Sequence, residues 1–221
     1  MLAVLGFILT GICFGVFAYT FENSVVRKTK LKLTSFSYAY YSLALAMITW
    51  GIAAAIGGAE VLAASVTIGN AFLLLGTIYM LDIWLGPKNR AWLWLAVIIA
   101  AGLLYARTAQ YPPTPFMRDG VLIFDTHIVA AAGLAAIFAL IWLPVNLKVA
   151  KQVTHKIGQD SIASIYSSIY IAATVSALIF IAARRTITVI LSFAAIGVCF
   201  AMLVQSNMLI AKMSKEKHHG K

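Results

Sequence analysis

Long uncharged apolar runs constrain this chain more than any other feature of its sequence. A helix that crosses a bilayer needs about 20 mostly apolar residues, and a strand of a membrane barrel needs only about ten, with alternating apolar and polar positions. The runs here are continuous, so they favour helices. Seven of them stand out, and the fourth is the shortest: residues 2–20, 35–56, 61–85, 91–106, 121–145, 161–183 and 187–211.

The short connections between these runs leave no stretch long and polar enough for a separate soluble domain. We therefore predict an all-α fold, a polytopic membrane bundle of seven transmembrane helices over residues 1–211, followed by a basic tail at 212–221. Composition agrees, because 62% of the residues are hydrophobic and only 11% are charged. Soluble domains have about 25% charged residues, so soluble globular and disordered proteins are excluded.

The formal charge of +10 reflects topology and does not indicate a nucleic-acid partner. Four basic residues lie in the connections on one side of the predicted bundle: Arg107, Arg118, Arg184 and Arg185. The other thirteen lie on the opposite side: Arg27, Lys28, Lys30, Lys32, Lys88, Arg90, Lys148, Lys151, Lys156, Lys212, Lys215, Lys217 and Lys221. The positive-inside rule then predicts an outer N-terminus and a cytoplasmic C-terminus. This basic cytoplasmic face is expected to attract the anionic leaflet of the lipid bilayer.

A comparison of the two halves of the chain suggests a parallel duplication. The matching positions, at offsets of 123 and 125 residues, are Asn23 with Asn146, Lys28 with Lys151, Tyr41-Ser42 with Tyr166-Ser167, and Thr49 with Thr174. Such matches are what a 3+1+3 arrangement would leave behind, with the fourth helix as the connector. The alternative is that these few identities arose by chance.

Ionisable side chains near membrane depth are the first candidate site residues, because each is costly there unless it is paired or wetted. Asp82 lies one turn after Tyr79, near the cytoplasmic end of the third run. It is either a cation or proton site or a carboxylate that pairs with neighbouring basic residues. Asp125 and His127 lie at the outer start of the fifth run. They suggest a pH sensor or the mouth of a ligand site, or an acid that the helix dipole favours.

Polar stripes on three predicted helices are the second group of candidates. Asn70 and Thr77 lie in the third run, Ser42 and Thr49 in the second, and Ser167 and Thr174 in the sixth. One interpretation is hydrogen bonding between packed helices. The other is that the stripes line a small polar cavity that holds a ligand or solute.

The remaining motifs predict packing and no catalysis. Gly11 and Gly15 form a GxxxG pair, which brings helices close together either within the chain or in a homodimer. Cys13 and Cys199 lie in separate apolar runs, so we expect no metal site. No hydrolase, metalloprotease or phosphate-loop motif is present, and residues 191–205 hold no lysine for a retinal Schiff base. We expect no enzymatic activity and no cofactor.

One pattern resembles the seven-helix membrane-sensing module of bacterial sensor histidine kinases. It consists of the basic segment Arg27–Lys32, then Ser35-Phe36, then the apolar stretch from Leu43 to Trp50, and Phe124–His127 is similar as well. The resemblance implies a sensor in a prokaryotic plasma membrane. No output domain follows Lys212 in this sequence, so the resemblance would imply a free-standing sensor or a partner subunit.

Three functions are therefore open at this point. The first is a non-catalytic membrane protein that senses or binds a small ligand within the bundle and acts through a membrane protein partner. The second is a small-solute transporter of 3+1+3 architecture. The third is a structural accessory subunit of a larger membrane complex, in which the polar stripes are packing surfaces.

Overall fold

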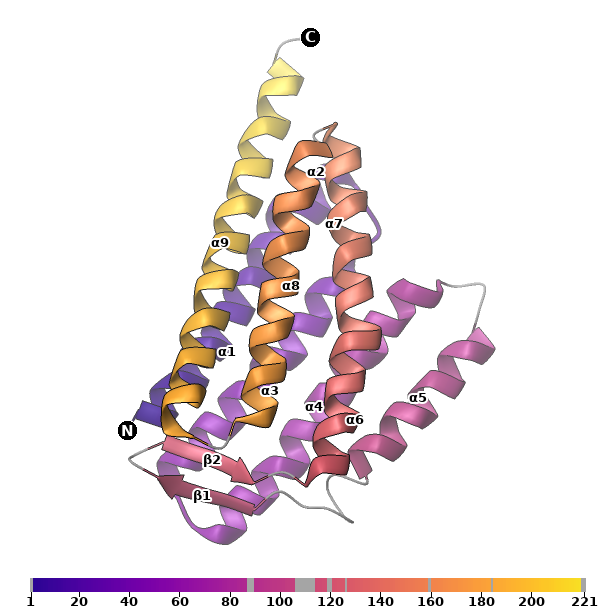
Figure 1. Ribbon diagram of the computed structural model, residues 1–221. Helices are drawn as coiled ribbons and strands as arrows, with labels where there is room; N and C mark the ends of the chain where they lie inside the picture. Colours follow the sequence, from indigo (N-terminus) through magenta and orange to yellow (C-terminus); the bar gives the residue numbers. More distant parts are fainter. Residues whose placement is uncertain are drawn as a thin grey trace.

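The computed structural model describes residues 2–86, 90–105, 114–118, 121–125, 127–158, 160–183 and 185–219. It is a bundle of long helices with a small β-hairpin at one end (Figure 1). Six helices among the described residues are long and apolar enough to cross a membrane: Val4–Val26, Thr34–Ile56, Glu60–Leu85, Ala131–Ile157, Ile162–Ala182 and Thr186–Ile210. The predicted helical membrane bundle is confirmed in this form.

The first half of the chain forms three long helical segments joined by tight turns. The first runs through α1 (Leu2–Phe21), a π-helical turn η1 (Glu22–Val26) and α2 (Arg27–Thr29). The chain reverses into α3 (Thr34–Ile56) and again into α4 (Ala59–Leu85). Gly57 and Gly58, between α3 and α4, have φ angles of 74° and 88°. Residues that carry a Cβ rarely adopt such positive φ angles, so glycine allows the tight reversal.

The second half also forms three long segments. The first runs through α6 (Ile128–Ile137), a π-helical turn η3 (Phe138–Trp142) and α7 (Leu143–Ile157). Then follow α8 (Asp160–Ala182) and α9 (Thr186–His219). Two of these segments extend beyond the predicted bounds, since α7 continues past Val145 and α9 continues past Ala211 into the basic tail. A helix can continue beyond its apolar part, because its backbone hydrogen bonds are internal and do not depend on the polarity of its side chains.

The start of the fifth predicted helix is wrong, because a short hairpin takes its place in a fold that is otherwise helical over the described residues. Residues 121–125 form strand β2 (Val121–Asp125), which pairs antiparallel with β1 (Thr114–Arg118). Arg118 lies opposite Val121. The two residues between them in the sequence are Asp-Gly, which is a strong hairpin signal in a sequence. The hairpin lies across the end of the bundle and contacts α1, α4 and α9 (Figure 1).

Helix α5 (Arg90–Tyr105) packs against α4 and α6 at the side of the bundle (Figure 1). It has 16 residues, which span about 24 Å at 1.5 Å per residue. The hydrocarbon core of a bilayer is about 30 Å thick. This helix is shorter than the six described above, and the count of seven transmembrane helices stays a prediction.

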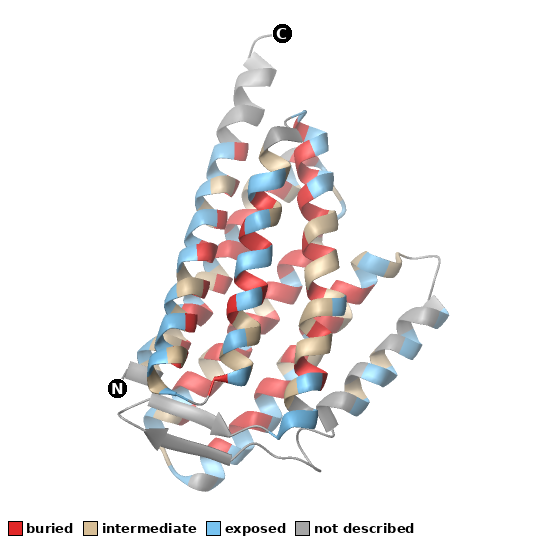
Figure 2. Cartoon of the chain, viewed as in Figure 1, coloured by how far each residue is buried: buried red, intermediate tan, exposed pale blue. Residues whose placement is uncertain are grey.

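The other six segments form a closed ring, in which α1 contacts α3, α3 contacts α4, α4 contacts α7 with η3, α7 contacts α8, α8 contacts α9, and α9 contacts α1. Buried residues occupy the sides of these helices that face their neighbours, and exposed residues occupy the outer sides (Figure 2). Aromatic rings form much of the interior. Phe17 packs edge-on against Tyr40 and Phe200, with ring centroids 4.8 and 5.3 Å apart.

The predicted GxxxG pair is used within the chain, between α1 and α3. A Cβ added at Gly11 would lie 2.8 Å from the Ile48 side chain and 3.1 Å from the Ala44 carbonyl oxygen. One at Gly15 would touch the Cβ of Ala44 at 4.0 Å. The two backbones approach closely because these positions lack side chains.

Candidate functional site

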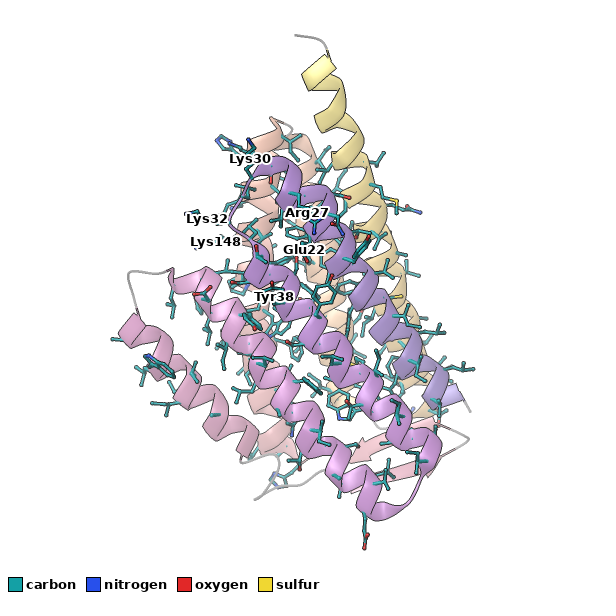
Figure 3. All side chains as sticks on the ribbon, turned by 180° about the vertical axis from the view of Figure 1, so that it is seen from behind. Glu22, Arg27, Lys30, Lys32, Tyr38 and Lys148 are labelled. Carbon is teal, nitrogen blue, oxygen red and sulfur yellow. The ribbon has the colours of Figure 1, made fainter. Side chains whose placement is uncertain are left out.

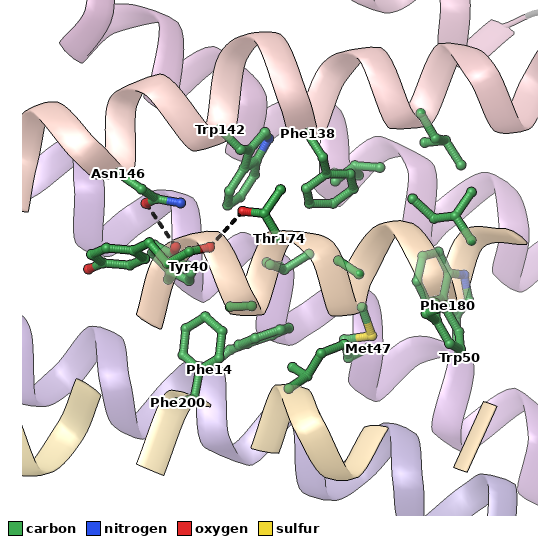
Figure 4. A pocket seen from close by; sticks show the side chains of 18 of the residues that line it. Phe14, Tyr40, Met47, Trp50, Phe138, Trp142, Asn146, Thr174, Phe180 and Phe200 are labelled. Atoms are coloured by element: carbon green, nitrogen blue, oxygen red, sulfur yellow. Dashed lines mark hydrogen bonds between the residues drawn. The ribbon is translucent and has the colours of Figure 1, made fainter. Parts of the chain in front are cut away.

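A cavity of about 90 Å³ lies at the centre of the ring (Figure 4). Each of the six segments contributes to its lining, so it lies between the two halves of the chain. Its walls are mostly aromatic and aliphatic, and the described lining residues include no Asp, Glu, Lys or Arg. The aromatic lining residues are Phe14, Tyr40, Trp50, Phe138, Trp142, Tyr170, Phe180 and Phe200.

One end of the cavity carries a polar pair that joins the two halves. The Tyr40 hydroxyl on α3 donates to the Asn146 Oδ1 on α7, at 2.9 Å (Figure 4). Both residues are buried, with exposed fractions of 2% and 4%. The bond occupies one end of the Asn146 amide. The Nδ2 end has no hydrogen-bond partner among the described residues, although Asn146 lines the cavity.

The π-helical turn η3 places two large rings against the cavity. Pro144 follows it in the first turn of α7. Proline has no N–H and clashes with the carbonyl four residues earlier, and the wider turn relieves this conflict, since the Leu143 N–H bonds to the Phe138 carbonyl five residues back. Phe138 and Trp142 then pack against each other at a tilt of 37°, with ring centroids 5.6 Å apart. Such π-helical turns are frequent at functional sites.

Trp142 is held in place by a residue of the first half. Its indole Nε1 donates to the Thr77 hydroxyl at 3.1 Å, and that hydroxyl donates to the Leu73 carbonyl within α4 at 2.8 Å. Trp142 and Thr77 have exposed fractions of 2% and 0%. The ring is therefore fixed from two elements, which is what a preformed cavity wall requires.

A second tyrosine–asparagine pair lies outside the cavity lining. The Tyr166 hydroxyl on α8 donates to the Asn207 Oδ1 on α9. The Nδ2 of Asn207 donates to the Thr20 hydroxyl on α1 at 3.3 Å. Both ends of this amide are bonded within the protein, unlike those of Asn146. The pair ties three helices together and has a structural role.

The other end of the cavity is walled by Trp50 and Phe180 (Figure 4). The Trp50 Nε1 donates to the Ser65 carbonyl at 3.1 Å. A Cβ at Gly69 would collide with this indole ring. Glycine at position 69 therefore leaves room for the Trp50 ring beside α4.

Most hydroxyl groups of the predicted polar stripes donate hydrogen bonds within their own helix. Ser42, Thr49 and Thr174 donate to the carbonyls four residues earlier, at 2.9, 2.8 and 2.9 Å. Only Thr174 of the predicted site residues lies among those that line the cavity. Ser167 is half-buried on α8, and Asn70 is buried on α4 with an exposed fraction of 4%.

The remaining predicted residues lie away from the cavity. The Tyr79 ring packs against Tyr38, with centroids 5.5 Å apart. Asp82 is exposed, and its Oδ2 accepts a hydrogen bond from the Ser35 hydroxyl at 3.0 Å. Thr77 is not among the residues that line the cavity, but its hydroxyl accepts the hydrogen bond of Trp142, which does line it.

Asp125 and His127 do not lie in a helix as predicted, because the hairpin replaces its first turn. Asp125 ends β2 opposite Thr114, and its side chain lies outside the described residues. His127 precedes α6 as its N-cap residue, and its Nδ1 accepts a hydrogen bond from the Val129 N–H at 3.3 Å. A side chain in this position satisfies an N–H that the helix itself leaves unpaired.

Basic side chains gather at the end of the bundle opposite the hairpin, where Arg27, Lys30, Lys32 and Lys148 lie (Figure 3). Lys148 on α7 also has a structural contact. Its Nζ donates to the Ile83 and Trp84 carbonyls at 2.9 and 3.2 Å. A cation there stabilises the last turn of α4, where carbonyls lack partners within the helix.

Asn146 lines the cavity but is not among the predicted site residues, and the sequence singles it out only as the position that matches Asn23. Asn207 lies in an apolar run and outside the cavity lining. The signal was the cost of burying an amide in apolar surroundings without partners. No family model, no curated protein and no solved structure matches this chain.

Proposed function

We propose that this protein binds a small ligand in the central cavity of its membrane bundle and acts as a sensor through a partner protein. The observation that carries the proposal is the cavity itself, since all six segments of the ring line it. A ligand there would touch both halves of the chain. Binding would therefore change how the halves pack, which is what a sensor needs to transmit.

The size and lining of the cavity favour a small uncharged ligand. One water molecule needs about 10–15 Å³ on this scale, and an engineered cavity of about 150 Å³ holds benzene. The present 90 Å³ suits a molecule of a few non-hydrogen atoms. An ion would lose its hydration without meeting an opposite charge among the described lining residues, which is strongly unfavourable.

The basic end of the bundle supports the partner side of the proposal. With the orientation predicted by the positive-inside rule, Arg27, Lys30 and Lys32 face the cytoplasm together with Lys148 (Figure 3). This face would meet the anionic leaflet and leave a charged surface for an acidic partner. Purification from native membranes tests this part. A partner that co-purifies in stoichiometric amount supports the proposal, and the absence of such a partner contradicts it.

Ligand binding is tested with the chain's own tryptophans as reporters. The protein has five, of which Trp50 and Trp142 line the cavity, whereas Trp84 and Trp94 are 42% and 66% exposed. In 5-fluorotryptophan-labelled protein in lipid nanodiscs, 2-butanone is expected to shift the ¹⁹F signals of Trp50 and Trp142 saturably. The exposed tryptophans serve as the control, because 2-butanone that merely partitions into the lipid shifts their ¹⁹F signals in proportion to its concentration.

A pair of variants on α8 provides the control. Ala173 lines the cavity, whereas Ala172 is exposed on the other side of the helix. Ala173→Leu is expected to fill the space and abolish the saturable shift, and Ala172→Leu is expected to leave it unchanged. If the wild type shows no saturable shift with 2-butanone or with a hydrocarbon of the same size, the proposal is wrong.

A small-solute transporter is the second candidate, and the closed ring favours it. The order of neighbours is the same in both halves, with α5 outside as a connector, as in a 3+1+3 repeat. Among the described residues, three hydrogen bonds between side chains link the halves, Tyr40 to Asn146, Trp142 to Thr77, and Asn207 to Thr20, and Lys148 adds two to carbonyls of α4. A rocking motion would have to break these bonds. Proteoliposomes that take up no member of a panel of small polar solutes would contradict this candidate.

A further inference from the structure

We infer that the ligand is a neutral molecule with a hydrogen-bond acceptor, such as a small ketone, and that the Asn146 amide recognises that acceptor. This inference rests on the proposed function and adds the chemical class of the ligand. It starts from a contrast between two buried asparagines. Asn207 uses its Oδ1 and its Nδ2 within the protein, whereas Asn146 bonds to other described residues through its Oδ1 alone.

The unused end of Asn146 lies at the cavity. The residue has an exposed fraction of 4% and lines the cavity. Its Oδ1 is held by the Tyr40 hydroxyl, which fixes the orientation of the amide, and its nitrogen lies on the side away from Tyr40 (Figure 4). An amide nitrogen donates two hydrogen bonds and accepts none. The matching ligand group is therefore an acceptor, of which a carbonyl oxygen is the simplest.

The rest of the lining specifies the body of the ligand. Trp142 lies next to Asn146 on one wall of the cavity with Phe138 beyond it, and Phe14, Phe200 and Met47 lie on the opposite wall (Figure 4). These side chains favour an apolar body. Without a charged side chain among the described lining residues, a carboxylate or an ammonium group would be excluded by its desolvation cost.

Two probes of the same shape separate this inference from the proposed function. 2-Butanone and 2-methyl-1-butene differ in one position, where C=O replaces C=CH₂. Their dissociation constants are measured from the saturable ¹⁹F shifts of Trp142 in nanodiscs, and each is expressed relative to its partitioning into empty nanodiscs. The wild type is expected to prefer the ketone by about threefold to tenfold, the net effect of one neutral hydrogen bond.

Asn146→Leu is expected to abolish this preference while the alkene still binds. The double variant Tyr40→Phe/Asn146→Leu gives the same readout without leaving the Tyr40 hydroxyl buried alone, in case the single variant fails to fold. Asn207→Leu is the matched control, since it removes a buried amide outside the cavity, and it should keep the preference. If both probes bind the wild type equally, or if Asn146→Leu keeps the preference, the inference is overturned and the cavity remains a binding site. If neither probe binds, the proposed function itself fails.

Discussion

At the scale of single residues, the informative feature is which hydrogen-bond partners the buried polar side chains have. A serine or threonine in a helix can bond to the carbonyl four residues earlier, as Ser42, Thr49 and Thr174 do. An asparagine presents a donor and an acceptor at different atoms, so it needs partners from other elements. Asn146 and Asn207 are therefore more informative about tertiary structure than the hydroxyl stripes.

A residue-scale prediction concerns Gly69, which makes room for Trp50. In Gly69→Ala the new Cβ collides with the indole ring, so Trp50 has to move and loses its bond to the Ser65 carbonyl. Overpacking of this kind costs about 1–3 kcal/mol. We expect an equivalent loss in the free energy of unfolding and a shift of the Trp50 ¹⁹F signal.

Gly197→Ala is the matched control for this prediction, because a Cβ at Gly197 meets no atom within 4 Å. This variant should leave both measurements unchanged. Equal unfolding free energies for the wild type and Gly69→Ala would show that α4 can move away from Trp50 at little cost, and the prediction would be wrong.

At the scale of elements, most helices could be predicted because length and apolar content are sufficient in a membrane. The helices predicted at 35–56 and 161–183 match α3 (Thr34–Ile56) and α8 (Asp160–Ala182) within a residue. The start of the fifth could not be separated from the hairpin by hydropathy, since Val121–Phe124 is as apolar as a helix. The cavity was also beyond prediction, because it depends on which faces of six segments meet.

The π-helical turn η3 gives an element-scale prediction. Pro144→Ala restores an N–H that can bond the Leu140 carbonyl, so we expect the turn to relax to an α-helix. Replacing the π-helical turn by α-helical turns rotates the segment before it relative to α7 by about 100°, which moves Leu134 and Phe138 relative to the rest of the cavity lining. The expected result is a several-fold weaker binding of 2-butanone and a shifted Trp142 ¹⁹F signal.

The sign of the stability change distinguishes this mechanism from simple damage. Removing a proline from a helix interior relieves a defect, so Pro144→Ala should resist unfolding at least as well as the wild type. Loss of binding together with loss of stability would mean that the variant is merely misfolded. Unchanged binding and an unchanged Trp142 signal would show that η3 does not depend on Pro144.

At the scale of the whole molecule, two opposite ends frame the cavity. The hairpin lies across one end (Figure 1), and Arg27, Lys30 and Lys32 gather at the other (Figure 3). Lys148 ties α7 to the last turn of α4 near the basic end. The sequence predicted which connections share a side from their charges, but the closure of the ring depends on contacts between residues far apart in the chain.

The last prediction is the topology, which depends on whether α5 crosses the membrane. If it does, the positive-inside rule places the basic end in the cytoplasm and the hairpin end outside. Single cysteines are introduced into a Cys13→Ala/Cys199→Ala background at four exposed positions. Glu60→Cys and Arg185→Cys should react with a membrane-impermeant maleimide in intact cells, and Lys32→Cys and Lys151→Cys only after permeabilisation. Glu60 precedes α5 in the chain and Arg185 follows it, so labelling of these two from opposite sides would mean that α5 does not cross. Labelling of both from the cytoplasm would mean that the bundle is inverted.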